Sequence, residues 1–133
     1  MGIRNVLLGA LATAGLAGAM LTAVTPGAAQ AAEGCTTKYP KTAAVVTLRS
    51  RAIELRYNSQ GCAWGRILRG SPGDLIWVDR SFDRGRTWQP HLGIRQIDTG
   101  GSQHTEPFNN KGNLIRACGK VSNYPEVHCT TWR

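Results

Sequence analysis

Apolar and polar residues alternate with a period of two in several short runs beyond residue 40, and turn-forming residues separate these runs. In the clearest run, residues 53–57, Ile53, Leu55 and Tyr57 share one face and two charged residues share the other. This alternation predicts a strand with one buried face. Residues 75–78 are apolar throughout, which predicts a central strand covered on both faces. No run has the spacing of an amphipathic helix of useful length.

Similar short runs occur along the rest of the chain. We expect further strands at residues 43–48, 62–69, 86–89, 93–98, 113–118 and 126–132, and loops at residues 99–104 and 109–112. About eight short strands predict an all-β fold, a small antiparallel β-sandwich or barrel. The chain has 133 residues, which is too short for two ordinary domains.

The first 31 residues have the pattern of a secretory signal peptide. Arg4 precedes an uncharged stretch over residues 6–24, and the sequence Ala-Gln-Ala at residues 29–31 fits the small-x-small rule for cleavage. Removal of residues 1–31 would leave residues 32–133 as a single secreted β domain with no membrane span. A retained membrane anchor is the alternative, because the uncharged stretch approaches spanning length.

Four cysteines remain in the expected secreted domain, at positions 35, 62, 118 and 129. An even number in a short exported chain predicts two disulfides, and three pairings are possible. We favour Cys35–Cys62 and Cys118–Cys129, because the second pair brackets a turn-rich stretch that can bring neighbouring strands together. A zinc site is the alternative, but C-x-x-C and H-x-x-x-H pairs are absent. We therefore expect neither a metal nor another cofactor.

An eight-residue stretch that begins at Ser81, Ser-Phe-Asp-Arg-Gly-Arg-Thr-Trp, matches the pattern S-x-D-x-G-x-T-W. It resembles the Asp-box of sialidase-type propellers and other secreted β-proteins, and the resemblance implies a hairpin away from any active site. We expect Asp83 to accept hydrogen bonds from its own turn and Gly85 to adopt positive φ. Thr87 would bond back across the turn, and Trp88 would pin the hairpin to the core. A single copy argues against a propeller.

A broader resemblance covers residues 53–58, I-E-L-R-Y-N, and residues 62–67, C-A-W-G-R-I. Together they are similar to the E-L-R-Y-S…C…W-x-R-I/V core of the YjfA-like secreted domain of unknown function. The resemblance implies a secreted location and a β fold. It implies no catalytic residue.

Basic residues outnumber acidic residues by 16 to 8, which gives a formal net charge of +8. Arginines occur in or beside nearly every expected strand, with tryptophans close to them in the sequence. Guanidinium pairs bidentately with phosphate and carboxylate, so a basic, aromatic face would suit an anionic polymer. The candidate ligand-binding residues are Arg56, Arg66, Arg69, Arg80, Arg95, Trp64 and Trp77. The alternative is a solvated basic surface with the tryptophans in the core.

A second set of residues, Glu54, His91, His104 and His128, offers a different chemistry. A carboxylate, a histidine and an arginine suffice for metal-free RNA cleavage, as acid, base and phosphate clamp. No spacing in the sequence links these residues, so a catalytic role is the alternative interpretation. A cleft that holds Glu54 beside a histidine and an arginine would favour an enzyme, whereas a flat basic face would favour binding.

The sequence therefore favours a secreted, extracellular or cell-wall-associated protein that binds an anionic cell-surface polymer and has no catalytic activity. Nucleic acid is a less favoured partner. A small secreted hydrolase such as a ribonuclease is one alternative function, and a secreted protein inhibitor with an exposed rigid loop is another.

Overall fold

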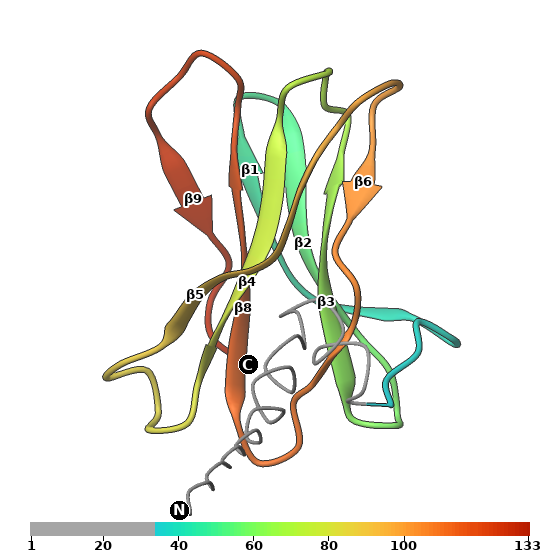
Figure 1. The fold of residues 1–133 in the computed structure, drawn as a ribbon, viewed down its shortest axis with the longest axis vertical. Coiled ribbons are helices and arrows are strands. Elements are labelled where there is room, and N and C mark those ends of the chain that lie inside the picture. Colours follow the sequence, from blue (N-terminus) through green and yellow to red (C-terminus); the bar gives the residue numbers. More distant parts are fainter. Residues whose placement is uncertain (1–33) are drawn as a thin grey trace, which may run out of the picture. The chain divides into compact units, whose positions relative to one another are not determined.

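The computed structural model describes residues 34–133 and shows an all-β fold. The predicted signal peptide lies outside the described residues. Within the described part, nine antiparallel strands form two sheets (Figure 1). No helix in this part is long and apolar enough to cross a membrane. The expected all-β antiparallel fold is confirmed.

Both predicted disulfides, Cys35–Cys62 and Cys118–Cys129, are present. Disulfides of this kind are typical of an extracellular or otherwise oxidising environment.

The first sheet contains five strands and carries the candidate site. Its strands are β1 (Lys41–Leu48), β2 (Arg51–Tyr57), β3 (Cys62–Leu68), β6 (Gln103–His104) and β7 (Phe108–Asn109). The order is β1-β2-β3-β6, and β7 pairs with the beginning of β3. Between β6 and β7, Thr105 continues the pairing. Its N–H donates to the Gly65 carbonyl (2.9 Å), and its hydroxyl accepts from the Gly65 N–H (3.2 Å).

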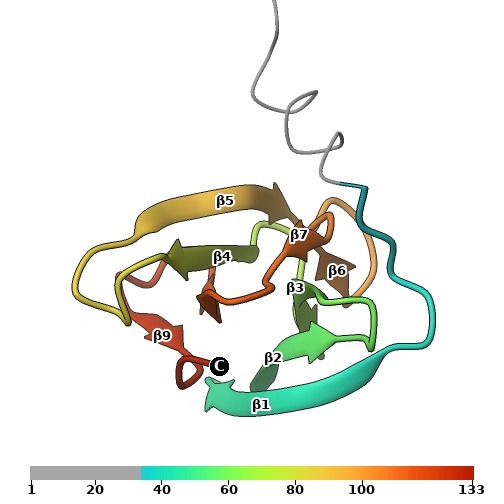
Figure 2. The ribbon, with the colours of Figure 1, turned by 90° about the horizontal axis from the view of Figure 1, so that it is seen from below.

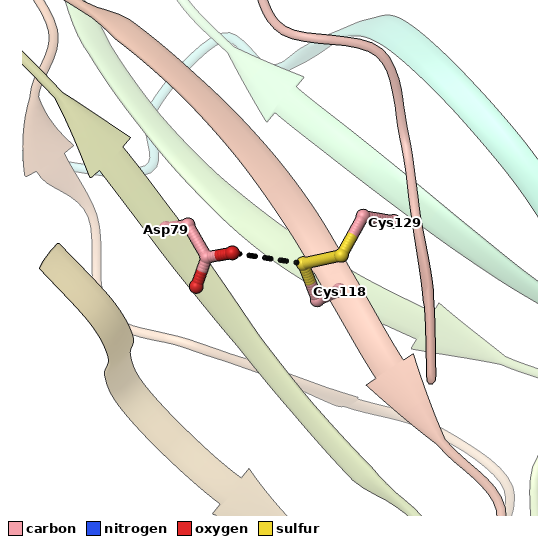
Figure 3. Close-up of side chains that lie close together, drawn as sticks. All are labelled: Asp79, Cys118 and Cys129. Atoms are coloured by element: carbon pink, nitrogen blue, oxygen red, sulfur yellow. Dashed lines mark hydrogen bonds between the residues drawn. A yellow bond between two sulfur atoms is a disulfide. The ribbon is translucent and has the colours of Figure 1, made fainter. Parts of the chain in front are cut away.

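The second sheet contains four strands in the order β5-β4-β8-β9. Their bounds are β4 (Leu75–Ser81), β5 (Gln89–Gln96), β8 (Leu114–Lys120) and β9 (Val127–Cys129). Strand β4 lies between β5 and β8 and is mostly buried, which confirms the central strand predicted for residues 75–78. The Cys118–Cys129 disulfide links β8 to β9 beside Asp79 of β4 (Figure 3).

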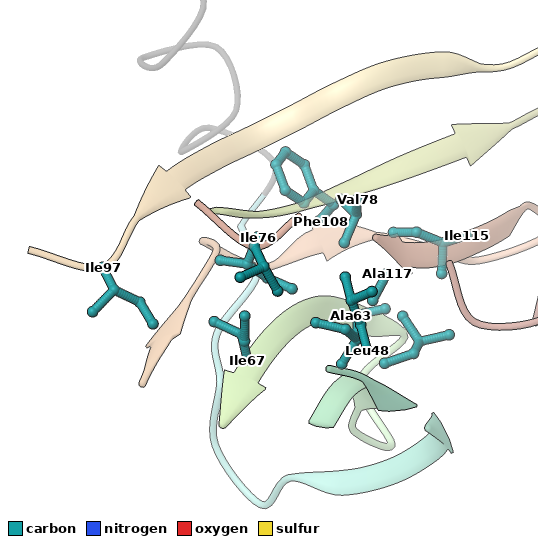
Figure 4. Packing of buried hydrophobic residues seen from close by; sticks show 12 residues of the cluster. Leu48, Ala63, Ile67, Ile76, Val78, Ile97, Phe108, Ile115 and Ala117 are labelled. Carbon is teal, nitrogen blue, oxygen red and sulfur yellow. The ribbon is translucent and has the colours of Figure 1, made fainter. Parts of the chain in front are cut away.

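The two sheets pack face to face, as an end view shows (Figure 2). The hydrophobic core lies between them (Figure 4) and consists of Leu48, Ile53, Leu55, Ala63, Ile67, Ile76, Val78, Ile97, Phe108, Ile115, Ala117 and Val121. These residues come from both sheets, so the packing is that of a β-sandwich.

The alternation predicted for residues 53–57 places Ile53, Leu55 and Tyr57 on one face of β2. Ile53 and Leu55 are buried in the core, whereas Tyr57 is 39% exposed. Tyr57 lies on the inward face as predicted but is only partly covered, because it is the last residue of β2. There it lines an opening between the sheets together with Asn110.

The predicted strands at residues 86–89 and 93–98 are wrong as separate elements. They correspond to one strand, β5, which begins at Gln89. This strand pairs irregularly with β4, and within it His91 and Gly93 have positive φ values of 57° and 62°. Residues that adopt positive φ are typical of turns, so the sequence predicts a break between two strands where the structure has one bulged edge strand.

The predicted loops at residues 99–104 and 109–112 also need correction. Residues 103–104 form β6 and residues 108–109 form β7. A two-residue pairing is too short to show alternation, which is why the sequence did not indicate these strands.

The turn that joins β4 to β5 is held by its own side chains. The N–H and hydroxyl of Thr87 donate to the two carboxylate oxygens of Asp83 (2.9 and 2.6 Å). The Ser81 hydroxyl donates to Asp83 Oδ1 (2.8 Å) and accepts from the Gly85 N–H (2.7 Å). Gly85 has a φ of 89°. These contacts agree with the roles predicted for Asp83, Gly85 and Thr87.

Trp88 does not pin this hairpin to the core, and that expectation is wrong. Its side chain is 44% exposed and its ring centroid lies 5.8 Å from that of Trp132. The Arg116 guanidinium lies over both rings, 4.7 Å from Trp88 and 4.4 Å from Trp132. The hairpin is therefore anchored on the outer face of the second sheet by a cation–π contact.

Replacing Asp83 with asparagine will lower the melting temperature and remove one source of acid sensitivity. Hydrogen bonds from Thr87 and Ser81 lower the pKa of Asp83 to about 2. A lowered folded-state pKa contributes stability above the unfolded pKa of about 3.9, and this is lost as pH falls towards the folded value. The melting temperatures of both proteins, measured between pH 2 and pH 6, should therefore converge at the acid end. The same change at exposed Asp98 is the control, and an equal effect there would refute the role of the turn.

Candidate anion-binding site

The outer face of the first sheet carries a row of three charged or ionisable side chains. Glu54 on β2 is directly opposite Arg66 on β3, and Arg66 is directly opposite His104 on β6. Directly opposite residues in an antiparallel pair point to the same face of the sheet. Because Ala63 and Ile67 of β3 point into the core, this row lies on the face away from it.

Arg66 and Glu54 form an ion pair within this row. Arg66 Nε and Nη2 lie 2.8 and 2.7 Å from Glu54 Oε1, and the Glu54 side chain is 13% exposed. The imidazole of His104 is oriented by a contact of 2.8 Å between its Nδ1 and the Thr105 carbonyl oxygen. A carbonyl oxygen only accepts hydrogen bonds, so Nδ1 carries a proton and Nε2 is the acceptor of the neutral ring.

A second row lies beside the first, where Arg56 of β2 is opposite Trp64 of β3. Arg56 Nη1 donates to the hydroxyl of Thr42, but its Nε is buried and has no hydrogen-bond partner. Burial lowers the pKa of Arg56, the nearby charge of Arg66 lowers it further, and Glu54 opposes both effects. The positive charge on Arg56 is thus incompletely compensated by the protein itself.

The two rows line a shallow hollow of about 170 Å³, which we call the outer-face hollow. Its lining residues are Thr37, Pro40, Arg56, Trp64, Arg66 and His104. Glu54 adjoins the hollow through its ion pair with Arg66.

One wall of the outer-face hollow is the segment that precedes β1. The Cys35–Cys62 disulfide ties this segment to the start of β3. Asn58 adds two hydrogen bonds, because its Nδ2 donates to the carbonyl oxygens of Thr36 (2.9 Å) and Lys38 (3.0 Å). The wall is therefore held both covalently and by a buried amide.

The other predicted arginines do not all gather at this hollow. Arg95 adjoins it, since its Nη1 lies 3.4 Å from the His104 carbonyl oxygen and its Nη2 lies 3.6 Å from Glu106. Arg69 donates to the Ser50 carbonyl at the turn between β1 and β2.

Arg80 lies elsewhere and is held by the second sheet and the core. It bonds to the side chain of Gln89 and lies over the rings of Phe82 and Phe108. The predicted basic face is thus reduced to Arg56, Arg66 and their neighbour Arg95.

Trp64 and Trp77 do not form an exposed aromatic surface, so that expectation is wrong. Their side chains are only 3% and 4% exposed. Both point away from the core, and each is covered. Trp64 lies under the wall of the outer-face hollow, and the Trp77 ring lies 4.8 Å from the ring of His91.

Of the three histidines considered for catalysis, the structure brings His104 alone to Glu54. His91 packs on Trp77 of the second sheet. His128 lies on β9, and its Nδ1 is 3.3 Å from the Thr47 carbonyl oxygen. Neither is part of the row formed by Glu54, Arg66 and His104.

A second cluster of potential ligand atoms, missed by the sequence, lies on the outer face of the second sheet. Asp79, Cys118 and Cys129 place one ligand atom each within 4.8 Å of one another (Figure 3). Both sulfurs belong to the disulfide and supply no thiolate for a metal. Asp79 Oδ2 instead accepts a hydrogen bond of 2.9 Å from Arg116 Nε and lies 3.4 Å from Cys118 Sγ. Because a disulfide sulfur carries no hydrogen, that contact is one of packing.

Comparisons with protein families, curated proteins and solved structures give no match for this chain. The outer-face hollow presents two guanidinium groups and an imidazole against a single carboxylate, an excess of positive charge that suits a bound anion.

Proposed function

We propose that the protein is exported and binds an anionic phosphodiester polymer of the cell surface through the outer-face hollow. The observation that supports this most directly is that Arg56 and Arg66 line the same open hollow, where the positive charge of Arg56 is incompletely compensated because burial and the charge of Arg66 lower its pKa. A bound phosphate would supply the missing negative charge. It would also accept hydrogen bonds from both guanidinium groups.

The shape and composition of the hollow suit the charged backbone of an extended polymer. The hollow is shallow and lies on an open sheet face, so a polymer chain can cross it rather than enter it end first. Trp64 is buried, so it offers no ring on which a base could stack. Binding would then depend on the phosphate charges of the polymer. We therefore expect it to be insensitive to the chemical groups that link one phosphate to the next.

An extracellular location accords with the two disulfides and with the net charge of +8, which favours polyanionic partners. Cleavage of residues 1–31 by signal peptidase and a relationship to the YjfA-like secreted domain form part of the same proposal. The basic character of the chain would concentrate it at a negatively charged wall.

Replacing Arg56 with glutamine is expected to weaken polymer binding by about tenfold, because one charge-assisted hydrogen bond to phosphate is lost. The probes are a single-stranded DNA oligonucleotide and a poly(glycerol phosphate) of similar length. Their dissociation constants are measured at several salt concentrations. Affinity should fall as salt rises, and the slope should be reduced by about one in the variant.

Arg84→Gln is the matched control, since it removes the same charge from the exposed turn between β4 and β5. Equal weakening by the two variants would mean that net charge alone causes binding, and the hollow would be rejected. No binding of either polymer at low ionic strength would reject the proposed function.

A further inference from the structure

We infer that RNA is a substrate of the outer-face hollow, with Glu54 and His104 as the catalytic residues of a phosphodiester transfer. This inference rests on the proposed function, because it requires the hollow to hold a phosphodiester first. It differs from the non-catalytic role that the sequence favours. The reason is the row of Glu54, Arg66 and His104, which depends on strand register and is not visible in the sequence.

The spacing of the row suits an in-line displacement at phosphorus. Neighbouring strands are about 4.8 Å apart, so the backbones of Glu54 and His104, two strands apart, are separated by about 10 Å. In such a displacement the attacking and leaving oxygens lie on opposite sides of the phosphorus, each within about 3 Å of its own acid or base. A phosphate placed over Arg66 would have Glu54 on one side and His104 on the other.

The proton transfers balance without any further reactant. The Glu54 carboxylate accepts the proton of the ribose 2′-hydroxyl as its oxygen forms a bond to phosphorus. The bond between phosphorus and the 5′-oxygen breaks, and the leaving oxygen takes a proton from Nε2 of the His104 imidazolium. The products are a 2′,3′-cyclic phosphate and a free 5′-hydroxyl. Proton exchange with solvent water then returns Glu54 to the carboxylate and His104 to the imidazolium.

The remaining polar groups are placed to assist this step. Hydrogen bonding of Nδ1 to the Thr105 carbonyl fixes the ring of His104 and leaves Nε2 for the substrate. Arg66 and Arg56 would stabilise the negative charge that develops on the phosphoryl oxygens. Arg66 makes both of its ion-pair contacts with one oxygen of Glu54, so the second carboxylate oxygen is not used by that ion pair.

The test uses an oligonucleotide with a single ribonucleotide in an otherwise deoxy strand, together with the fully deoxy strand. Wild-type protein should cut the first strand once, after the ribonucleotide, and leave a cyclic phosphate that mass spectrometry identifies. Glu54→Gln and His104→Gln should each lower the cleavage rate by at least about 100-fold, the usual contribution of a positioned acid or base. Both variants should still bind the deoxy strand measurably, because each retains Arg56 and Arg66.

His128→Gln is the matched control for the histidine change, because it makes the same substitution at a histidine outside the row. It should cleave as fast as the wild type. A bell-shaped dependence of rate on pH is expected for one acid and one base. The charged groups around His104 are Arg66 on β3, directly opposite it, and Arg56 on β2, which lines the same hollow. Arg95 on β5 contacts the His104 carbonyl oxygen, with Glu106 beside Arg95.

The outcomes separate this inference from the proposed function. Binding of the deoxy strand without cleavage of the ribonucleotide would overturn the inference and leave the proposed function intact. Absence of binding to either strand would overturn both. Equal cleavage by wild type, Glu54→Gln and His104→Gln would assign the activity to a contaminant. If Glu54→Gln fails to fold, the exposed His104→Gln variant decides the question.

Discussion

Replacing Asp74 with asparagine is expected to destabilise the fold by about 3–5 kcal/mol, because it removes one partner of a buried ion pair. The Asp74 side chain is 0% exposed. Its Oδ2 accepts hydrogen bonds from Arg51 Nε (2.8 Å) and the Ser71 N–H (2.9 Å), and its Oδ1 accepts from the Ser122 N–H (3.0 Å). All three partners are donors, so the amide of asparagine would turn a donor of its own towards one of them.

The effect is expected to be global because Asp74 joins several loops at one end of the sandwich. Arg51 begins β2, Ser71 belongs to the loop between β3 and β4, and Ser122 follows β8. The backbone of Asp74 adds a further link, since its carbonyl accepts from the Ile97 N–H (2.9 Å). Losing the carboxylate therefore weakens contacts among three separate stretches of the chain, which contain Arg51, Ser71 and Ser122.

The free energy of unfolding is measured by urea denaturation with tryptophan fluorescence. Burial by itself raises the pKa of Asp74, but hydrogen bonds from Arg51, Ser122 and Ser71 outweigh it and the pKa is lowered. The stability that this carboxylate contributes is present above the unfolded pKa of about 3.9 and is lost as pH falls through the folded value. The difference between the two proteins should therefore shrink in acid.

Asp98→Asn, at an exposed position, serves as the control and should change stability by no more than about 0.5 kcal/mol. A loss below about 1 kcal/mol for Asp74→Asn at neutral pH would contradict the importance of this buried carboxylate.

Two sequence patterns predict the strands at the centres of the sheets. Period-two alternation identifies Ile53 and Leu55 as core residues, and the uninterrupted apolar run at residues 75–78 identifies a strand covered on both faces. Neither pattern predicts β6 or β7, because their register is set by the neighbouring strand β3 and by Thr105. Such pairings depend on where the chain returns in space, which no local pattern encodes.

The candidate site was missed for the same reason. The sequence indicates Glu54, Arg66 and His104 as candidate residues, but 50 positions separate the first from the last. They meet because β6 pairs with β3 at the point where β3 already pairs Arg66 with Glu54. The sequence could identify the residue types that suit the chemistry but not their placement in one row.

Trp64 and Trp77 are buried, which explains why period-two alternation does not predict whether an aromatic face is exposed. Both tryptophans point away from the core, as a period of two requires, but the outward face of each sheet is itself covered. The segment before β1 covers Trp64, and His91 of the edge strand packs on Trp77. A strand pattern shows which residues share a face, and coverage by other segments decides whether that face reaches solvent.

Removing the Cys35–Cys62 disulfide by a double change to serine is expected to cost about 3–4 kcal/mol. The two cysteines are 27 residues apart, and closing a loop of that length restricts the unfolded chain by this amount in the entropic account. The segment that forms one wall of the outer-face hollow would lose its covalent tie. Asn58 would then be its main attachment, through the carbonyl oxygens of Thr36 and Lys38.

Binding of the deoxy strand should therefore weaken along with stability, and native tryptophan fluorescence should shift to longer wavelength as Trp64 gains solvent. The Cys118–Cys129 pair is the control, since its 11-residue separation predicts a similar cost of about 3 kcal/mol on the other sheet. Its double serine variant should lose stability but keep its affinity for the strand. If affinity falls equally in both variants, the loss of affinity reflects lower stability alone. The wall of the outer-face hollow would then have no specific role in binding the phosphodiester.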